Sequence, residues 1–64
     1  MPPTFDIRNR ATGALITRFT PRPEVWEVMQ RRMAALDESA EELIREAIGS
    51  FLDLEVEVSP EQVH

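Results

Sequence analysis

The chain has 64 residues, a formal net charge of −5 and no cysteine. So short a chain forms one domain, and it buries only about 60% of the surface that its unfolded form exposes. Without cysteine it cannot form disulfides, thiolate zinc sites or iron–sulfur clusters, so we expect a homodimer to complete its marginal core.

The start of the sequence lacks the basic and apolar segments of a signal peptide, and no apolar stretch is long enough to cross a membrane. We therefore predict a cytoplasmic protein with no membrane partner.

Charge is distributed unevenly along the chain. Residues 1–22 carry four arginines against one aspartate, whereas residues 23–64 carry three arginines against eleven carboxylates. Such a difference in sign is more informative than the total charge. Every basic residue is arginine, whose planar group suits phosphate and guanine, although a coding preference for arginine over lysine explains the same composition.

The first elements predicted along the chain are two strands. Residues 5–9 alternate apolar and polar side chains, which is the period of a half-buried strand. Residues 14–20 are rich in β-forming residues, and the connection between the two runs contains Gly13. Together they predict a β-hairpin, preceded by a disordered start at residues 1–3.

Two amphipathic helices are predicted next. The first spans about residues 23–36, because Pro23 suits a first helical turn and apolar residues then recur at helical spacing. The second begins at Ser39, which with Glu42 completes a capping box before a broad apolar face.

Residues 54–58 alternate again, as a short third strand or as a fraying extension before a disordered end. We thus divide the chain into a disordered start (1–3), a folded domain (4–53) and a C-terminal extension (54–64).

Little in the sequence supports catalysis. The lone histidine, His64, stands at an end that we expect to fray, and the two glycines do not form a phosphate-binding loop. Glu42 and Glu46 lie one helical turn apart and could hold a divalent cation, but a hydrated acidic helix face explains them more simply. We predict no enzyme, no metal and no cofactor.

The order of strand, helix, turn and helix resembles the ribbon-helix-helix family of small DNA-binding proteins. Residues 16–21 (ITRFTP) look like the strand of that family, and residues 39–48 (SAEELIREAI) are similar to its second helix. The resemblance covers about residues 15–53. It implies an α+β fold in which an N-terminal strand or hairpin precedes two helices and two chains intertwine as a dimer. The upstream strand at residues 5–9 either widens the ribbon or marks a different ββαα fold.

The resemblance also implies which residues have which role. Arg18 would read base edges in the DNA major groove, with Ile16 and Thr20 on the same outward face of the strand. Ser39 and the amides that follow it would grip a phosphate. Arg8 and Arg10 lie upstream of the resemblance, and the positive charge of residues 1–22 predicts that they contact phosphates as well. The dimer core would contain Phe19, Trp26, Met29, Met33, Leu36, Leu43, Ile44, Ala47, Ile48 and Phe51.

Our leading hypothesis is therefore a homodimeric DNA-binding regulator of the repressor or antitoxin type, with a toxin as a further protein partner. The alternative is an acidic protein-interaction module, such as an accessory subunit or a viral inhibitor. The positions of Arg8, Arg10 and Arg18 discriminate between the two. If they converge on one exposed sheet face, DNA is favoured, and if they pair with the chain's own carboxylates, DNA is not favoured.

Overall fold

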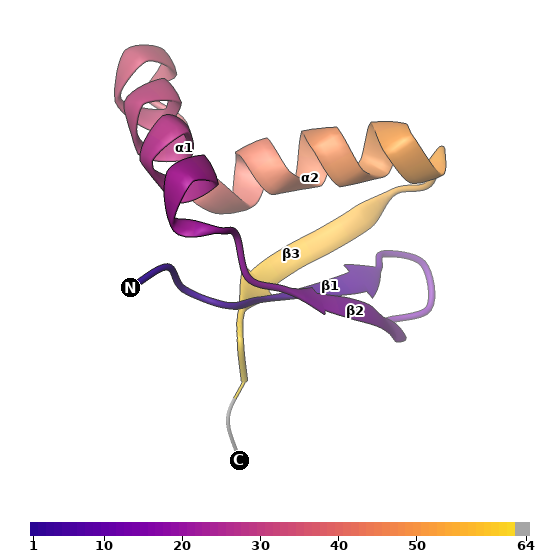
Figure 1. Ribbon diagram of the computed structural model, residues 1–64. Helices are drawn as coiled ribbons and strands as arrows, with labels where there is room; N and C mark the ends of the chain where they lie inside the picture. Colours follow the sequence, from indigo (N-terminus) through magenta and orange to yellow (C-terminus); the bar gives the residue numbers. More distant parts are fainter. Residues whose placement is uncertain (63–64) are drawn as a thin grey trace.

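Three antiparallel strands form one sheet, and both helices lie on the same side of it (Figure 1). The computed structural model describes residues 1–62. In chain order the elements are β1 (Phe5–Asn9), β2 (Leu15–Phe19), α1 (Pro23–Leu36), α2 (Ala40–Leu52) and β3 (Val56–Pro60). The α+β class is confirmed. The predicted order of a hairpin and two helices is incomplete, because a third strand follows the helices.

The predicted hairpin is confirmed, and Asn9 and Gly13 shape its turn. The side-chain oxygen of Asn9 accepts hydrogen bonds from the amides of Ala11 and Thr12, at 2.8 and 3.2 Å. Gly13 has φ +75°, a conformation that glycine adopts without steric cost. Pairing between β1 and β2 then runs from Phe5 opposite Phe19 to Arg8 opposite Leu15, with one β-bulge along the way.

Both helices begin and end where local sequence signals place them. Pro23 occupies the first turn of α1, and the Ser39 hydroxyl caps α2 by accepting from the Glu42 amide at 3.2 Å. Each helix ends at an aspartate in the left-handed conformation, Asp37 after α1 and Asp53 after α2.

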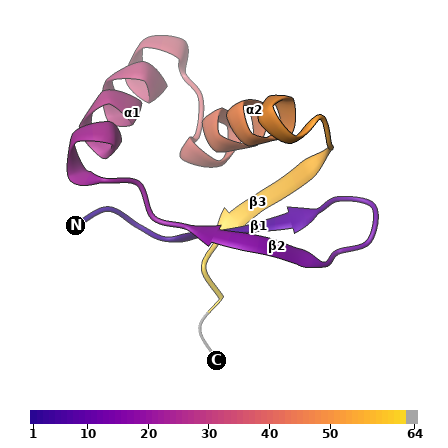
Figure 2. The same cartoon turned by 45° about the vertical axis from the view of Figure 1, so that its right-hand side comes forward.

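The alternating segment near the C-terminus is a strand. β3 pairs antiparallel with β1, and Val58 lies opposite Ile7, so β1 is the central strand (Figure 2). The chain stays bonded past β3, since the Glu61 amide donates to the Thr4 carbonyl at 3.0 Å. The disorder that we predicted for the final residues falls partly on residues 63–64, which lie outside the described residues.

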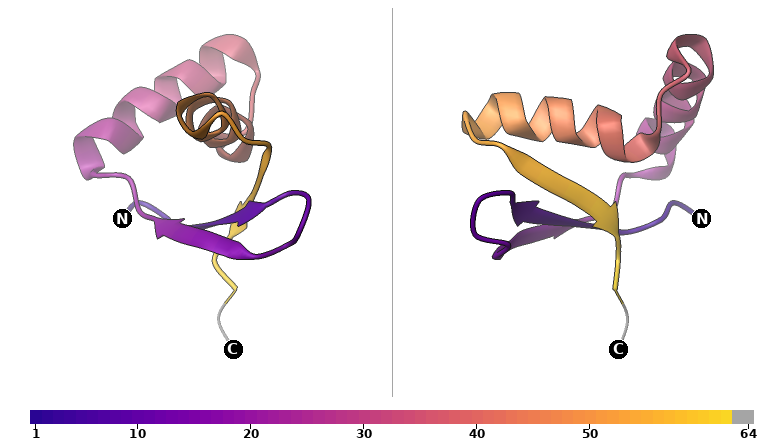
Figure 3. Two further views of the ribbon diagram at one scale, coloured as in Figure 1. Left: turned by 90° about the vertical axis from the view of Figure 1, so that its right-hand side faces the viewer. Right: turned by 180° about the vertical axis from the view of Figure 1, so that it is seen from behind.

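The core lies between the sheet and α2. The buried core cluster among the described residues has five apolar members, and they come from β1, α2 and β3: Phe5, Ile7, Ala40, Ile44 and Val56. None of the fourteen residues of α1, all of them described, is buried. Figure 3 shows why: α2 lies over the sheet, whereas α1 projects to one side of it. The α1 helix is held by half-buried side chains, among them Trp26, whose ring centroid is 6.3 Å from that of Phe5.

Candidate interaction site

The face of the sheet away from the helices carries a buried carboxylate. Phe5 and Ile7 are buried beneath the helices, so the intervening Asp6 points to the opposite face. Arg18 lies directly opposite Asp6 on β2, and its Nε donates to Asp6 Oδ1 at 2.9 Å. Arg18 therefore faces away from the helices, but its guanidinium is held by an acid of the same sheet.

Asp6 ties together three segments of the chain. Its side chain is 0% exposed, its Oδ2 accepts from the Gln62 amide at 3.3 Å, and Arg8 Nη2 lies 3.7 Å from the same oxygen. Burial by itself would raise the pKa of the Asp6 carboxyl. The hydrogen bonds from Arg18 and Gln62, together with the charges of Arg18 and Arg8, hold that pKa below its ordinary value instead. The carboxylate thus stays ionised and offsets arginine charge at neutral pH.

The three arginines expected to contact DNA all pair with carboxylates of this chain. Arg10 lies 3.9 Å from Glu55, and Arg18 also lies 4.0 Å from Glu61, in addition to the two contacts with Asp6. Pairing with β3 places Glu57 opposite Arg8, so a further acid shares the same sheet face. The face that would meet DNA is consequently of mixed charge.

Of the other residues assigned to DNA binding, Ile16 and Thr20 stand two residues before and after Arg18 on or next to β2, whereas Ser39 caps α2. The Thr20 hydroxyl is hydrogen-bonded to that of Thr4 at 2.7 Å, and the Ile16 side chain is 40% exposed on β2. The Ser39 hydroxyl is engaged by its own helix. Ser39 begins α2, which covers one face of the sheet, whereas Arg18 lies on the other face beside Asp6. The two residues therefore belong to opposite faces of the molecule.

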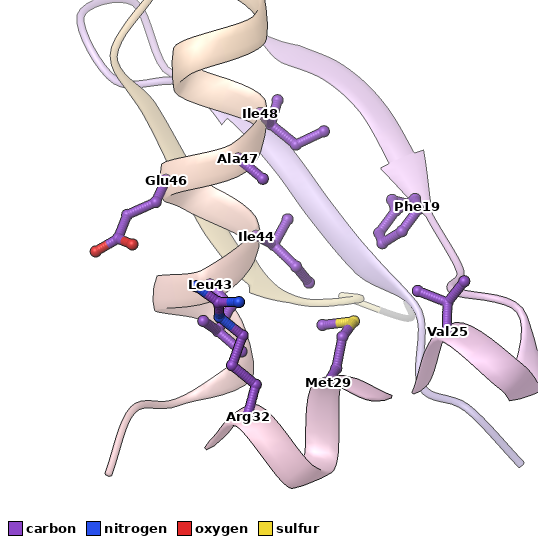
Figure 4. Close-up of a pocket in the computed structure, with 9 residues that line it drawn as sticks. All are labelled: Phe19, Val25, Met29, Arg32, Leu43, Ile44, Glu46, Ala47 and Ile48. Carbon is purple, nitrogen blue, oxygen red and sulfur yellow. The ribbon is translucent and has the colours of Figure 1, made fainter. Parts of the chain in front are cut away.

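An apolar hollow of about 490 Å³ opens between the two helices above the end of β2. We call it the α1–α2 groove. Its lining residues are Phe19, Val25, Met29, Arg32, Leu43, Ile44, Glu46, Ala47 and Ile48. Figure 4 shows the apolar side chains converging from β2, α1 and α2, whereas the Glu46 carboxylate points away from them. The groove therefore offers an apolar surface with few polar groups.

The predicted dimer core divides into a covered and an uncovered part. Ile44 is buried, and five further members pack against the buried core: Phe19, Trp26, Met29, Met33 and Ile48. Leu43 is half-buried, whereas Ala47, Leu36 and Phe51 are exposed, Phe51 to 86%. Val25, which lines the groove, is not among the predicted dimer-core residues, although its spacing from Met29, one helical turn, places both on one side of α1.

The free edge of the sheet adjoins the groove. The strand order β2-β1-β3 gives β2 a strand neighbour on one side only among the described residues. Phe19, at the end of β2, also lines the groove. An unpaired strand edge presents backbone N–H and C=O groups to any extended chain that approaches it.

Neither described helix is long and apolar enough to cross a membrane. Within residues 1–62, no three histidine, cysteine, aspartate or glutamate side chains come together as a metal site. Comparison of the chain with known protein families, with curated proteins and with solved structures finds no match.

Proposed function

We propose that this chain is a non-enzymatic protein-interaction module that binds a polypeptide in the α1–α2 groove and along the free edge of β2. The observation that carries the proposal is the groove itself, an apolar hollow of about 490 Å³ beside the free edge of β2. Peptide-binding domains commonly combine a strand edge, which supplies backbone hydrogen bonds, with apolar pockets that hold alternate side chains.

The lining of the groove favours a polypeptide over a small metabolite. Sites for small molecules are also mostly apolar, but they contain a few polar groups that converge on the ligand and fix its orientation. Here the polar side chains are Arg32 and Glu46, and the latter points out of the hollow. Apolar side chains of another chain fit such a lining without leaving polar groups unpaired.

DNA binding, as a repressor or antitoxin, is the second candidate function. It is favoured by Arg8 and Arg18, which share one sheet face and keep side-chain exposures of 33% and 52%. It ranks second because Asp6, Glu57 and Glu61 accompany them there. Acids on the face that approaches phosphate reduce electrostatic attraction.

A displayed library of random peptides tests the leading proposal. Wild-type protein, immobilised sparsely, is expected to enrich peptides with apolar residues at alternate positions. Ala47→Arg should weaken the enriched peptides about tenfold, because it places a charged side chain in an apolar site. The matched control is Ala34→Arg, an exposed helix position in α1 that does not line the groove.

Two outcomes would contradict the proposal. One is that no peptide is enriched, and the other is that the selected peptides bind both arginine variants equally well. Glu42→Lys separates groove binding from docking on the acidic first turn of α2. It should leave groove peptides unaffected, whereas a basic partner held by that turn would be lost.

A further inference from the structure

We infer that the polypeptide bound at this site is a second copy of the chain, placed by antiparallel pairing of the two β2 edges with each groove covered by the other copy. This inference rests on the proposed function of the groove. It adds the identity of the partner and the symmetry of the complex.

The chain exposes more surface than a compact monomer of its mass. The chain exposes 4812 Å², whereas a compact monomer of its mass is expected to expose about 4200 Å². The excess of about 600 Å² approaches the roughly 800 Å² that each partner buries in a standard interface. A second copy is thus enough to cover the excess.

Exposed and half-buried apolar residues of both helices line the groove. Leu43, Ala47 and Phe51 recur every four residues and so follow one side of α2, and the first two line the groove. Across from them, α1 contributes Val25 and Met29 although none of its residues is buried. A helix with no buried residue gains stability when a partner covers its apolar side.

The backbone of the hairpin shows which groups of β2 are available. The Asn9 amide donates to Ala14, on the β2 side, and the next amide, Arg10, donates to Glu55, on the β3 side. Backbone groups of successive strand residues therefore point to alternate sides.

Continuing this alternation along β1 directs Ile7 toward β2, so its partner Thr17 faces β1 and Arg18 faces the free edge. Antiparallel pairing through such an edge is self-complementary under a two-fold axis, so one surface can serve both copies. The result would be a continuous sheet with the order β3-β1-β2-β2-β1-β3.

The charges near the two-fold axis between the two β2 strands allow the strands to pair. Each copy carries −5 overall, so two copies repel at long range. At the edge itself, the positive charge of Arg18 is offset by Asp6, 2.9 Å away. Two β2 strands can therefore meet without bringing two unpaired guanidinium groups together.

Sedimentation equilibrium of the full chain tests the inference. Wild type should sediment as a dimer at micromolar concentration, and Ala47→Arg should raise the dissociation constant about tenfold or more. Because the substitution makes each copy less acidic, weakened association could not come from added repulsion. Ala34→Arg makes the same charge change away from the groove and should behave as wild type. Circular dichroism and urea unfolding of both variants check that the fold is retained.

Amide hydrogen exchange provides the second measurement. The Arg18 amide should exchange slowly in the dimer and faster on dilution, because it gains a partner across the axis. A chain that stays monomeric, or a dimer unaffected by Ala47→Arg whose Arg18 amide exchanges freely, would overturn the inference. If a monomeric chain still binds selected peptides that Ala47→Arg weakens, the proposed function stands and only the identity of the partner is wrong.

Discussion

Asp6 shows how much one position in a strand can depend on distant parts of the chain. The alternation of residues 5–9 correctly directs Phe5 and Ile7 to one side and Asp6 to the other. An outward carboxylate is ordinarily exposed, yet this one is fully covered by Arg18, Arg8 and the segment after β3. The alternating pattern predicts which way the Asp6 side chain points, but it does not predict which residues cover it. Those residues lie up to 56 positions away in the sequence.

The lowered pKa of Asp6 makes part of the stability dependent on acid. A carboxyl group whose pKa is lower in the folded than in the unfolded chain stabilises the fold at pH values above its unfolded pKa, near 3.8. That stabilisation is lost as the pH falls through the pKa of the folded chain. We expect Asp6→Asn to lower the urea midpoint at pH 7. The variant should also lose less of its remaining stability than wild type between pH 5 and the acid limit of folding.

The control for this experiment is Glu27→Gln, which removes an exposed carboxylate from α1. Its acid dependence should follow that of wild type. If Asp6→Asn and wild type lose stability in parallel as the pH falls, the carboxylate does not hold the charge network described for it.

At the scale of elements, sequence signals correctly predicted the helix starts and the hairpin, because these features depend on residues close together in the chain. Pro23 and the Ser39 cap mark helix starts through groups within one turn, and Gly13 marks the hairpin through its own backbone. The sequence does not decide between a third strand and a fraying extension at residues 54–58, because alternation alone does not identify the strand with which this segment would pair. The partner, β1, lies on the far side of both helices in the sequence.

Val56 tests whether β3 is an integral strand. Its side chain is 1% exposed, so Val56→Ala should lower the free energy of unfolding by about 2 kcal/mol through lost burial and the cavity left behind. Val58→Ala removes the same atoms from a half-buried position of the same strand and should cost less. Equal and negligible effects in urea unfolding would show that β3 frays from the sheet in solution.

At the scale of the whole molecule, separation of charge along the sequence does not become separation in space. The net-positive segment 1–22 contains β1 and β2. β3 pairs with β1, and this pairing places Glu57 and the following Glu61 near the arginines of that segment. A sum over sequence segments cannot anticipate this, because strand pairing mixes residues from both ends of the chain.

The ranking of the two functions predicts the result of a DNA selection. Wild type is expected to retain nothing from a random DNA pool even at about 50 mM salt, where phosphate contacts are strongest. The contrary result would be a selected site whose affinity falls by about 1–3 kcal/mol in Arg18→Ala, as for a base contact. Arg8→Ala would then mainly reduce the salt dependence, as for a phosphate contact.

The strand order β2-β1-β3 also bears on how the chain reaches its fold. The hairpin joins strands separated by only five residues, so its closure costs little chain entropy. Pairing of β1 with β3 must instead bring together segments that lie on either side of two helices, and contacts of such long sequence separation slow folding. The burial of Ile7 and Val56, one on each strand, depends on that long-range step. A chain with its hairpin and helices formed would therefore still lack its core until the last strand returned.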